Sequence, residues 1–209
     1  MIFYLVIMFI VCLDLEGVLT PEVWINVALK TGIDELKLTT RDVSDYDVLM
    51  KKRLKILEEH DIKLIDIQKV ISKMELIPGA KEFMDWLQSV TQGIIATDSY
   101  IEFAMPLIRK LGYPTVFCHN LEVNEKGIIT NYLLRIDNMK KKTVESFKEM
   151  NFKVIAVGDS YNDIGMLNAA NYGILFRPPD NVIKEFPQFP VVTKYTELKE
   201  IISKYLNQE

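Results

Sequence analysis

The chain has 209 residues, of which 49% are hydrophobic, and it carries a formal net charge of −4 at pH 7. That length and hydrophobic content suffice for one α/β domain with an insertion, while the acidic balance excludes the basic footprint of a nucleic-acid-binding protein. The two cysteines are too few for the disulfide framework of a secreted protein, which favours a reducing compartment. We therefore expect a cytoplasmic protein that binds small molecules and no nucleic acid.

The first apolar run, residues 2–13, raises the question of a signal peptide or a membrane anchor. It falls short of the roughly 20 apolar residues that a bilayer-spanning helix needs, and no positive charge precedes it as in a secretory signal. Because six or seven of these residues suffice for a strand, Met8 is an alternative start, with residues 1–7 as an extension or an extra piece of strand. We therefore expect no membrane association, and N-terminal sequencing that finds Met1 retained would contradict the alternative start.

The run IVCL, residues 10–13, is typical of a buried central strand in a parallel sheet. Two carboxylates, Asp14 and Glu16, follow it, and ligands in open α/β sheets bind beyond the carboxyl ends of the strands. Gly17 invites a turn, so Asp14 is the acid whose position at the strand end follows from the pattern. A carboxylate at this place can attack phosphorus to form an aspartyl phosphate, provided that a cation offsets the repulsion between two anions.

Residues 20–74 change character, because helical periodicity replaces short apolar runs. Three helices are expected: from Pro21 to Gly32, from a cap at Ser44 or Asp45, and from Lys63 to about Lys73. This segment is too short for an independent domain, so we expect a helical cap over the Asp14 pocket, with residues 1–19 and 75–209 as the catalytic core. A cap of this kind excludes water and selects the substrate.

After residue 79, helices and strands alternate in the pattern of βαβ units. The helices are expected at residues 80–90, 100–111, 140–150, 164–170, 179–186 and 195–206, and the strands at 93–97, 154–158 and 172–176. A hairpin is expected over residues 116–136, with its turn at 124–127. The pattern predicts the α/β class with a central parallel sheet.

Polar residues also follow two of these later strands. The strand over 154–158 leads to Asp159 and Asp163, the strand over 93–97 ends at Thr97, and three lysines open the helix at residue 140. Each of these features alone has a structural explanation. Acidic residues often cap helices or form turns, and a run of lysines is most often the solvent-exposed start of a helix. Two acidic clusters at two strand ends favour a shared site over these separate explanations.

In this chain order, the motifs DLEGV, the strand end at Thr97, the lysine cluster and GDSYND resemble those of the haloacid dehalogenase superfamily of phosphohydrolases. The resemblance spans most of the chain and implies a three-layer Rossmann-like core. It implies that Asp14 is the nucleophile and that Glu16, in place of the usual aspartate, is the general acid and base. It also implies a Mg²⁺ ion held by Asp14, the backbone carbonyl of Glu16 and Asp159, with Asp163 bound through water.

The resemblance implies contacts to the phosphoryl oxygens as well. The Thr97 hydroxyl and the backbone N–H groups after it, including that of Asp98, would form a nest for the anion. Lys140 aligns best with the lysine that supplies a fixed positive charge, although Lys141 and Lys142 stay open as alternatives. Asn162 is the expected polar contact to phosphate or substrate.

Within the superfamily, the chain resembles the phosphoserine phosphatases and, more specifically, their bifunctional branch that transfers phosphate to homoserine. The matching stretches are DLEGVLTPE, TTRD-x-x-DYDVLMK, KRLKIL, GDSYND and NVI-x-EFPQFP. This resemblance implies that Glu22 holds the ammonium of phosphoserine and that Arg53 grips its carboxylate, although a charged residue on a helix is usually a solvated face. It further implies homoserine as acceptor and assembly as a homodimer.

Two alternatives stay open at this stage. One is a phosphatase of the same fold that acts on another small phosphomonoester, and the other is a phosphate-binding protein without catalysis. The full set of acids at residues 14, 16, 159 and 163 argues against the second alternative. The two histidines, His60 and His119, belong to no motif and are expected at the surface or in loops.

Overall fold

The structure, a computed structural model, describes residues 8–39, 43 and 45–208. The predictions made for residues 1–7, and Ser44 as a helix cap, lie outside the described residues. The other predicted cap, Asp45, accepts a hydrogen bond at 3.1 Å from the N–H of Val48 and begins a helix there. In the described part of the chain, no helix has the length and apolar character to cross a membrane.

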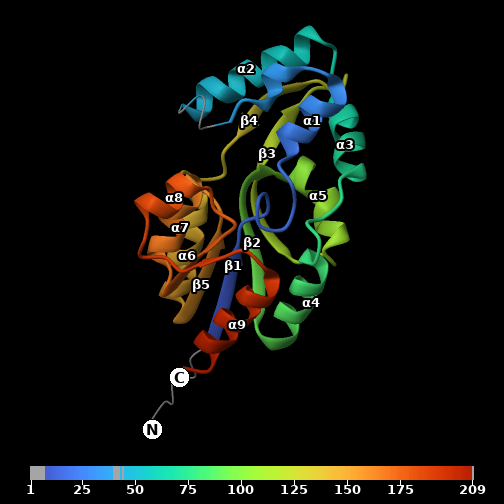
Figure 1. The fold of residues 1–209 in the computed structure, drawn as a ribbon. Coiled ribbons are helices and arrows are strands. Elements are labelled where there is room, and N and C mark those ends of the chain that lie inside the picture. Colours follow the sequence, from blue (N-terminus) through green and yellow to red (C-terminus); the bar gives the residue numbers. More distant parts are fainter. Residues whose placement is uncertain (1–7, 40–42, 44, 209) are drawn as a thin grey trace.

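A seven-stranded sheet in the order β4-β3-β2-β1-β5-β6-β7 forms the centre of the molecule (Figure 1). Its strands are β1 (Met8–Leu13), β2 (Gln92–Tyr100), β3 (Thr115–Val123), β4 (Ile129–Leu133), β5 (Phe152–Gly158), β6 (Tyr172–Phe176) and β7 (Val191–Val192). β1 lies between β2 and β5 and is parallel to both, while β4 closes an antiparallel hairpin with β3. The predicted α/β class with a central parallel sheet is confirmed. The sequence does not predict β7, because two residues are too few to show a periodic pattern.

Helices cover both faces of this sheet. They are α1 (Val23–Thr31), η1 (Asp34–Lys37), α2 (Tyr46–Glu59), α3 (Leu64–Lys73), α4 (Ala80–Val90), α5 (Ile101–Lys110), α6 (Met139–Glu149), η2 (Tyr161–Asp163), α7 (Ile164–Ala169), α8 (Asp180–Glu185) and α9 (Tyr195–Leu206). Alternate residues of a strand point to opposite faces. Val11 and Leu13 of β1 therefore pack with α4, α5 and α9, whereas Ile10 and Cys12 pack with α6, α7 and α8. The result is the three-layer arrangement expected of a Rossmann-like core.

The helices α1, α2 and α3 form a separate group beside α5 and the β3–β4 hairpin (Figure 1). Their common core joins Trp24 from α1, Leu57 from α2 and Ile71 from α3 to buried residues of α5 and of the hairpin. These helices lie within the segment 20–74 that the sequence predicts as a cap. The limits of the cap as a domain stay a prediction.

Candidate active site

Asp14 follows β1 at the carboxyl end of the strand, and its side chain is buried with 4% exposure. Its backbone N–H donates to the carbonyl of Val157 at 3.0 Å, and its Oδ1 accepts from the N–H of Leu15 at 2.7 Å. Its Oδ2 lies 3.0 Å from Nζ of Lys140. Burial and the neighbouring carboxylate of Asp163 raise the pKa of Asp14 well above its ordinary value, while the Lys140 charge acts in the opposite direction.

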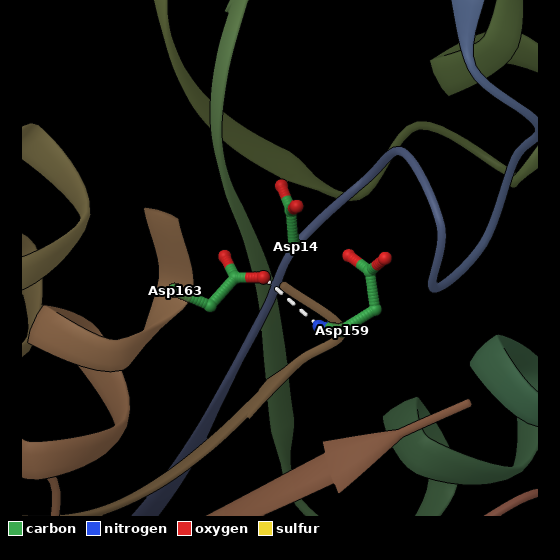
Figure 2. A group of neighbouring side chains, drawn as sticks. All are labelled: Asp14, Asp159 and Asp163. Atoms are coloured by element: carbon green, nitrogen blue, oxygen red, sulfur yellow. Dashed lines mark hydrogen bonds between the residues drawn. The ribbon is translucent and has the colours of Figure 1, made fainter. Parts of the chain in front are cut away.

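Asp159 and Asp163 reach the same point from the end of β5. Oδ2 of Asp163 accepts from the backbone N–H of Asp159 at 2.9 Å and from that of Ser160 at 3.1 Å, which holds the turn after β5 in place. Figure 2 shows the carboxylates of Asp14, Asp159 and Asp163 around one point, and one oxygen of each lies within 4.8 Å of the others. The two acidic clusters of the sequence therefore meet in space.

Two glycines make this close approach feasible. Gly17 has a φ of 80° in the turn after the nucleophile candidate, and a Cβ there would collide with the carboxylate of Asp159. A Cβ at Gly158 would collide in the same way with the side chain of Asp163. Both positions therefore need a residue without a side chain, because the acids pack directly on the backbone.

The donor set fits a hard divalent cation. Mg²⁺ prefers several oxygen ligands in octahedral geometry, and Asp14, Asp159 and Asp163 supply carboxylate oxygens close enough to surround one ion. Lys140, the cation that contacts two of them, leaves negative charge in excess, and a bound cation would offset it. Glu16 is not part of this cluster through its side chain, since its Oε2 accepts from the N–H of Val23 at 2.8 Å.

Glu16 lies in the turn after β1 with its carboxyl directed to the start of α1. Burial and the negative charge of Glu22 raise the pKa of Glu16 to about 7, while hydrogen bonds from the N–H of Val23 and from the Ser99 side chain act against the rise. A carboxyl with this pKa exchanges its proton near neutral pH, as a general acid and base must.

Lys140 is the lysine of the cluster that enters the site. It is 3% exposed in the first turn of α6, and its Nζ lies 2.8 Å from Asp163 Oδ1 and 3.2 Å from Asp98 Oδ2. Burial disfavours the charge on Lys140, but the carboxylates around it raise its pKa well above the ordinary value. Lys141 is exposed instead and pairs with Glu145 at 3.6 Å.

The last residues of β2 bring Thr97 and Asp98 to the site. Thr97 is 2% exposed, and its Oγ1 accepts from the N–H of Ser99 at 3.2 Å. The Asp98 carboxylate accepts from Nδ2 of Asn162 at 3.1 Å. Burial acts to raise the pKa of Asp98, but Lys140 and the Asn162 hydrogen bond hold it below its ordinary value. The sequence gives a role to the backbone of Asp98 alone and does not predict that its carboxylate pairs with the lysine.

His119 is a residue that sequence reasoning places wrongly. It lies buried in β3 with 3% exposure, so the expectation of a surface or loop position is wrong for it. Its Nδ1 accepts from the N–H of Arg135 at 3.1 Å, and its Nε2 lies 3.9 Å from Asp98 Oδ1. Burial lowers the pKa of His119, although the charge of Asp98 opposes this shift. His60 is exposed at the end of α2, as expected.

Between the strand ends and the cap lies a pocket of about 250 Å³. The predicted site residues that line it are Asp14, Glu16, Glu22, Arg53, Thr97, Asp98, Lys140, Asp159 and Asn162. Asp163 is fully buried and does not line it, but contacts Lys140 Nζ at 2.8 Å. The sequence analysis gives no role to two tyrosines of the same lining, Tyr46 and Tyr100. The signal that could have found Tyr100 is its place directly after the polar strand end at residues 97–99.

On the cap side, Arg53 is 7% exposed and lies over the ring of Trp24, with 4.5 Å between Cζ and the ring centroid. Its Nη2 donates to the carbonyl of Leu38 at 2.7 Å, while its buried Nε has no hydrogen-bond partner among the described residues. Glu22 is exposed at the start of α1. On the core side, Lys140 lies among carboxylates whose excess negative charge a bound cation would offset, and on the cap side Arg53 keeps an unsatisfied donor. With such a cation bound, the pocket would suit a ligand with two anionic groups.

Comparisons with known proteins agree with this geometry. Residues 10–171 match the family model of the haloacid dehalogenase-like hydrolases. The chain is 55% identical over 190 residues to a Pseudomonas aeruginosa protein named phosphoserine phosphatase ThrH, in an alignment that covers 91% of this chain and 93% of that protein. It is 54% identical over 200 residues to the phosphoserine phosphatase of Pseudomonas syringae pv. tomato, covering 96% of this chain and 84% of that protein.

The fold has a counterpart among solved structures. The crystal structure of a phosphoserine phosphatase in its apo form matches with a TM-score of 0.76 over 94% of this chain and 98% of that chain. The two sequences are 21% identical, so this match supports the shared fold alone.

Proposed function

Since the chain belongs to the haloacid dehalogenase-like hydrolases, we propose that it removes phosphate from O-phospho-L-serine through a phosphorylated Asp14. The observation that carries the proposal is the meeting of three groups at one end of the pocket. Asp14 supplies a buried carboxylate, Lys140 lies 3.0 Å from it, and Glu16 has a pKa of about 7. Its two relatives at 54% and 55% identity are named phosphoserine phosphatases, which supports the same substrate here.

In the first step, a carboxylate oxygen of Asp14 attacks phosphorus, and the bond between phosphorus and the serine oxygen breaks. Glu16 in its protonated form gives its proton to the departing oxygen, so that serine leaves as a neutral alcohol. Lys140 and the Thr97 hydroxyl offset charge on the phosphoryl oxygens. A bound Mg²⁺ would be held by Asp14, the Glu16 carbonyl and Asp159, with Asp163 in support, and would neutralise charge between the two anions.

In the second step, Glu16 is a carboxylate and takes a proton from water while the water oxygen attacks phosphorus. The bond between phosphorus and Asp14 breaks, and inorganic phosphate leaves. Because Glu16 donates a proton in one step and accepts one in the next, a pKa near neutral pH serves both directions.

Recognition of the amino acid is assigned to the cap. A buried Arg53 Nε without a partner among the described residues is costly unless a ligand supplies an acceptor, and an arginine fork matches a carboxylate. Glu22, on the rim of the same pocket, provides a negative charge for the substrate ammonium. We assign contact with substrate on the core side to Asp98 and Asn162, which hydrogen bond to each other beside Lys140.

We also propose that L-homoserine can replace water in the second step, as the resemblance of DLEGVLTPE and its Glu16 to the bifunctional branch implies. The atoms follow the same course: the homoserine oxygen bonds to phosphorus, the Asp14 bond breaks, and Glu16 takes the hydroxyl proton. A cytoplasmic location and assembly as a homodimer stay predictions from the sequence.

The test is phosphate release from O-phospho-L-serine with and without Mg²⁺, followed by addition of L-homoserine and detection of O-phosphohomoserine. Lys140→Ala and Lys141→Ala form a matched pair, because the first side chain lies in the site and the second is exposed. We expect loss of activity in Lys140→Ala and near-normal activity in Lys141→Ala. If the protein cleaves p-nitrophenyl phosphate but not phosphoserine, the proposed roles of Arg53 and Glu22 in substrate binding are contradicted. The proposed catalytic roles of Asp14, Glu16 and Lys140 are then still supported.

A further inference from the structure

Tyr46 and Tyr100 approach each other at the wall of the pocket. Tyr46, the first residue of α2, comes from the cap, and Tyr100, the last residue of β2, comes from the core. Both line the pocket, and their hydroxyl oxygens are 2.6 Å apart, so one hydroxyl donates a hydrogen bond to the other. The pair therefore joins the cap to the core at the pocket itself.

Packing holds both rings in position. Tyr100 is 2% exposed, and its ring meets the ring of Phe103 edge-on with 5.7 Å between centroids. The ring of Tyr46 meets that of Tyr132 in the same manner, also at 5.7 Å. Because packing already orders the two hydroxyls in the folded protein, a ligand that contacts them loses little further side-chain entropy.

The hydroxyl pair is neutral. Burial raises the pKa of Tyr46 and of Tyr100 above the ordinary value, while the nearby charge of Arg53 opposes both shifts. Two neutral hydroxyls carry two protons, and only one of these lies between the two oxygens. Among the described residues, neither hydroxyl has a further hydrogen-bond partner, so the pair can donate one hydrogen bond to a ligand and accept another from it.

The role of this pair rests on the proposed function. In the second step, water and an alcohol react alike: the new O–P bond forms, the bond to Asp14 breaks, and the proton passes to Glu16. The reacting groups therefore do not distinguish the two nucleophiles, and the surroundings must do so. Water enters any opening, whereas an amino-acid alcohol needs contacts that hold it in the pocket.

We infer that the Tyr46–Tyr100 hydroxyl pair determines which nucleophile takes the phosphoryl group. The hydrogen bond keeps the cap closed against water, and the remaining hydroxyl proton and lone pairs hold the polar groups of an amino-acid alcohol beside Arg53. These two tyrosines are thus specificity-determining residues for the acceptor, while the catalytic groups remain common to hydrolysis and transfer.

The test removes each hydroxyl and keeps the ring, in Tyr46→Phe and Tyr100→Phe. Tyr132→Phe is the matched control, because its hydroxyl donates to Asp47 of α2 at 2.6 Å but does not line the pocket. Each protein receives O-phospho-L-serine, Mg²⁺ and L-homoserine, and the ratio of O-phosphohomoserine to inorganic phosphate is measured. Both products come from the same phosphorylated enzyme, so this ratio is independent of how fast that enzyme forms.

We expect the ratio to fall about fivefold in Tyr46→Phe and Tyr100→Phe, the size of effect that one net hydrogen bond supports, and to change less than about twofold in Tyr132→Phe. An unchanged ratio in both pocket variants, or an equal fall in the control, overturns the inference. A wild-type protein that hydrolyses phosphoserine and forms no O-phosphohomoserine also overturns it, while hydrolysis as the proposed function stands.

A second measurement needs no substrate. Backbone hydrogen exchange in α2 is expected to be faster in the two pocket variants than in the wild type, because the cap opens more often. Unchanged exchange in α2 overturns the closing role of the pair. If the wild type does not cleave phosphoserine but the two variants still exchange faster in α2, the proposed substrate is contradicted and the closing role of the pair is supported.

Discussion

The core side and the cap side of the pocket differ in how far their polar groups are already satisfied. On the core side, Lys140 contacts three carboxylates, and Asp163 accepts hydrogen bonds from Lys140 and from two backbone N–H groups. On the cap side, Arg53 is buried with an Nε that has no partner among the described residues, and Glu22 is exposed. The core side is organised before a ligand arrives, whereas the cap side keeps groups that a ligand would satisfy.

This difference suggests a division of roles, in which the core side carries out the reaction and the cap side selects the substrate. Charges that are fixed in advance stabilise a transition state without reorganisation, and that is the condition of the groups at the strand ends. Substitutions of residues on the core side should therefore lower the rate with every phosphate ester. The effects of substitutions on the cap side should depend on which phosphate ester or which acceptor is used in the assay.

Asp14→Asn should have the largest effect. The amide keeps the shape of the side chain but lacks the anionic oxygen, so phosphate release should fall about 10⁴-fold or more with phosphoserine and p-nitrophenyl phosphate alike. The measurement is steady-state phosphate release, with circular dichroism as the control for folding. More than a tenth of the wild-type rate in a folded variant would remove Asp14 from the role of nucleophile.

Glu16→Gln should lower the rate about 10²- to 10⁴-fold, the range ascribed to general acid–base catalysis. The pH–rate profile of the wild type should contain an ionisation near pH 7 that the variant lacks, because burial and Glu22 raise the pKa of Glu16 to about 7. The measurement is kcat/KM across pH 5 to 9 for both proteins, because kcat/KM reports ionisations of the free enzyme. The same ionisation in the variant would assign it to another group.

Arg53→Ala should act on the cap side alone. Loss of the guanidinium should raise the KM for phosphoserine about 10- to 100-fold. The effect with p-nitrophenyl phosphate should be smaller, because that ester has no carboxylate. Lys52→Ala is the control, since Lys52 is an exposed neighbour on the same helix. Equal losses with both esters would mean that Arg53 supports the fold or the core side and not the recognition of a carboxylate.

The smallest expected effect concerns stability. The folded state raises the pKa of Glu16 from 4.5 to about 7, so the folded protein binds this proton more tightly than the unfolded chain does. By linkage, the contribution of Glu16 to the free energy of unfolding should decrease as pH rises from about 4.5 to about 7. Urea unfolding without divalent cations should show this decrease in the wild type relative to Glu16→Gln. A difference between the two proteins that is constant with pH would contradict the raised pKa.

The choice among three lysines illustrates a contact that sequence reasoning left open. Lys140, Lys141 and Lys142 look alike along the chain, but successive helical residues point about 100° apart. Val144 of the same helix is fully buried against the sheet, and Lys140 lies one turn before it on the same face. Helical spacing from a core residue therefore contains the information, although the position of the helix over Asp14 does not follow from it.

The positions of His119 and of the tyrosine pair could not be inferred in this way. His119 occupies a strand that the sequence predicts, but its neighbour Asp98 belongs to another strand. Tyr46 and Tyr100 are 54 residues apart and lie in different layers of the molecule. No local pattern connects such residues, because their contact depends on where the cap docks.

The sequence by itself determined the α/β class, the order of the elements apart from β7, η1 and η2, and the acids at the ends of β1 and β5, because strand and helix periodicity are properties of neighbouring residues. Only the tertiary structure decided which polar groups meet: Lys140 with Asp98 and Asp163, His119 behind Asp98, and Tyr46 with Tyr100. These contacts join distant segments, and the packing of helices on the sheet and of the cap on the core sets them.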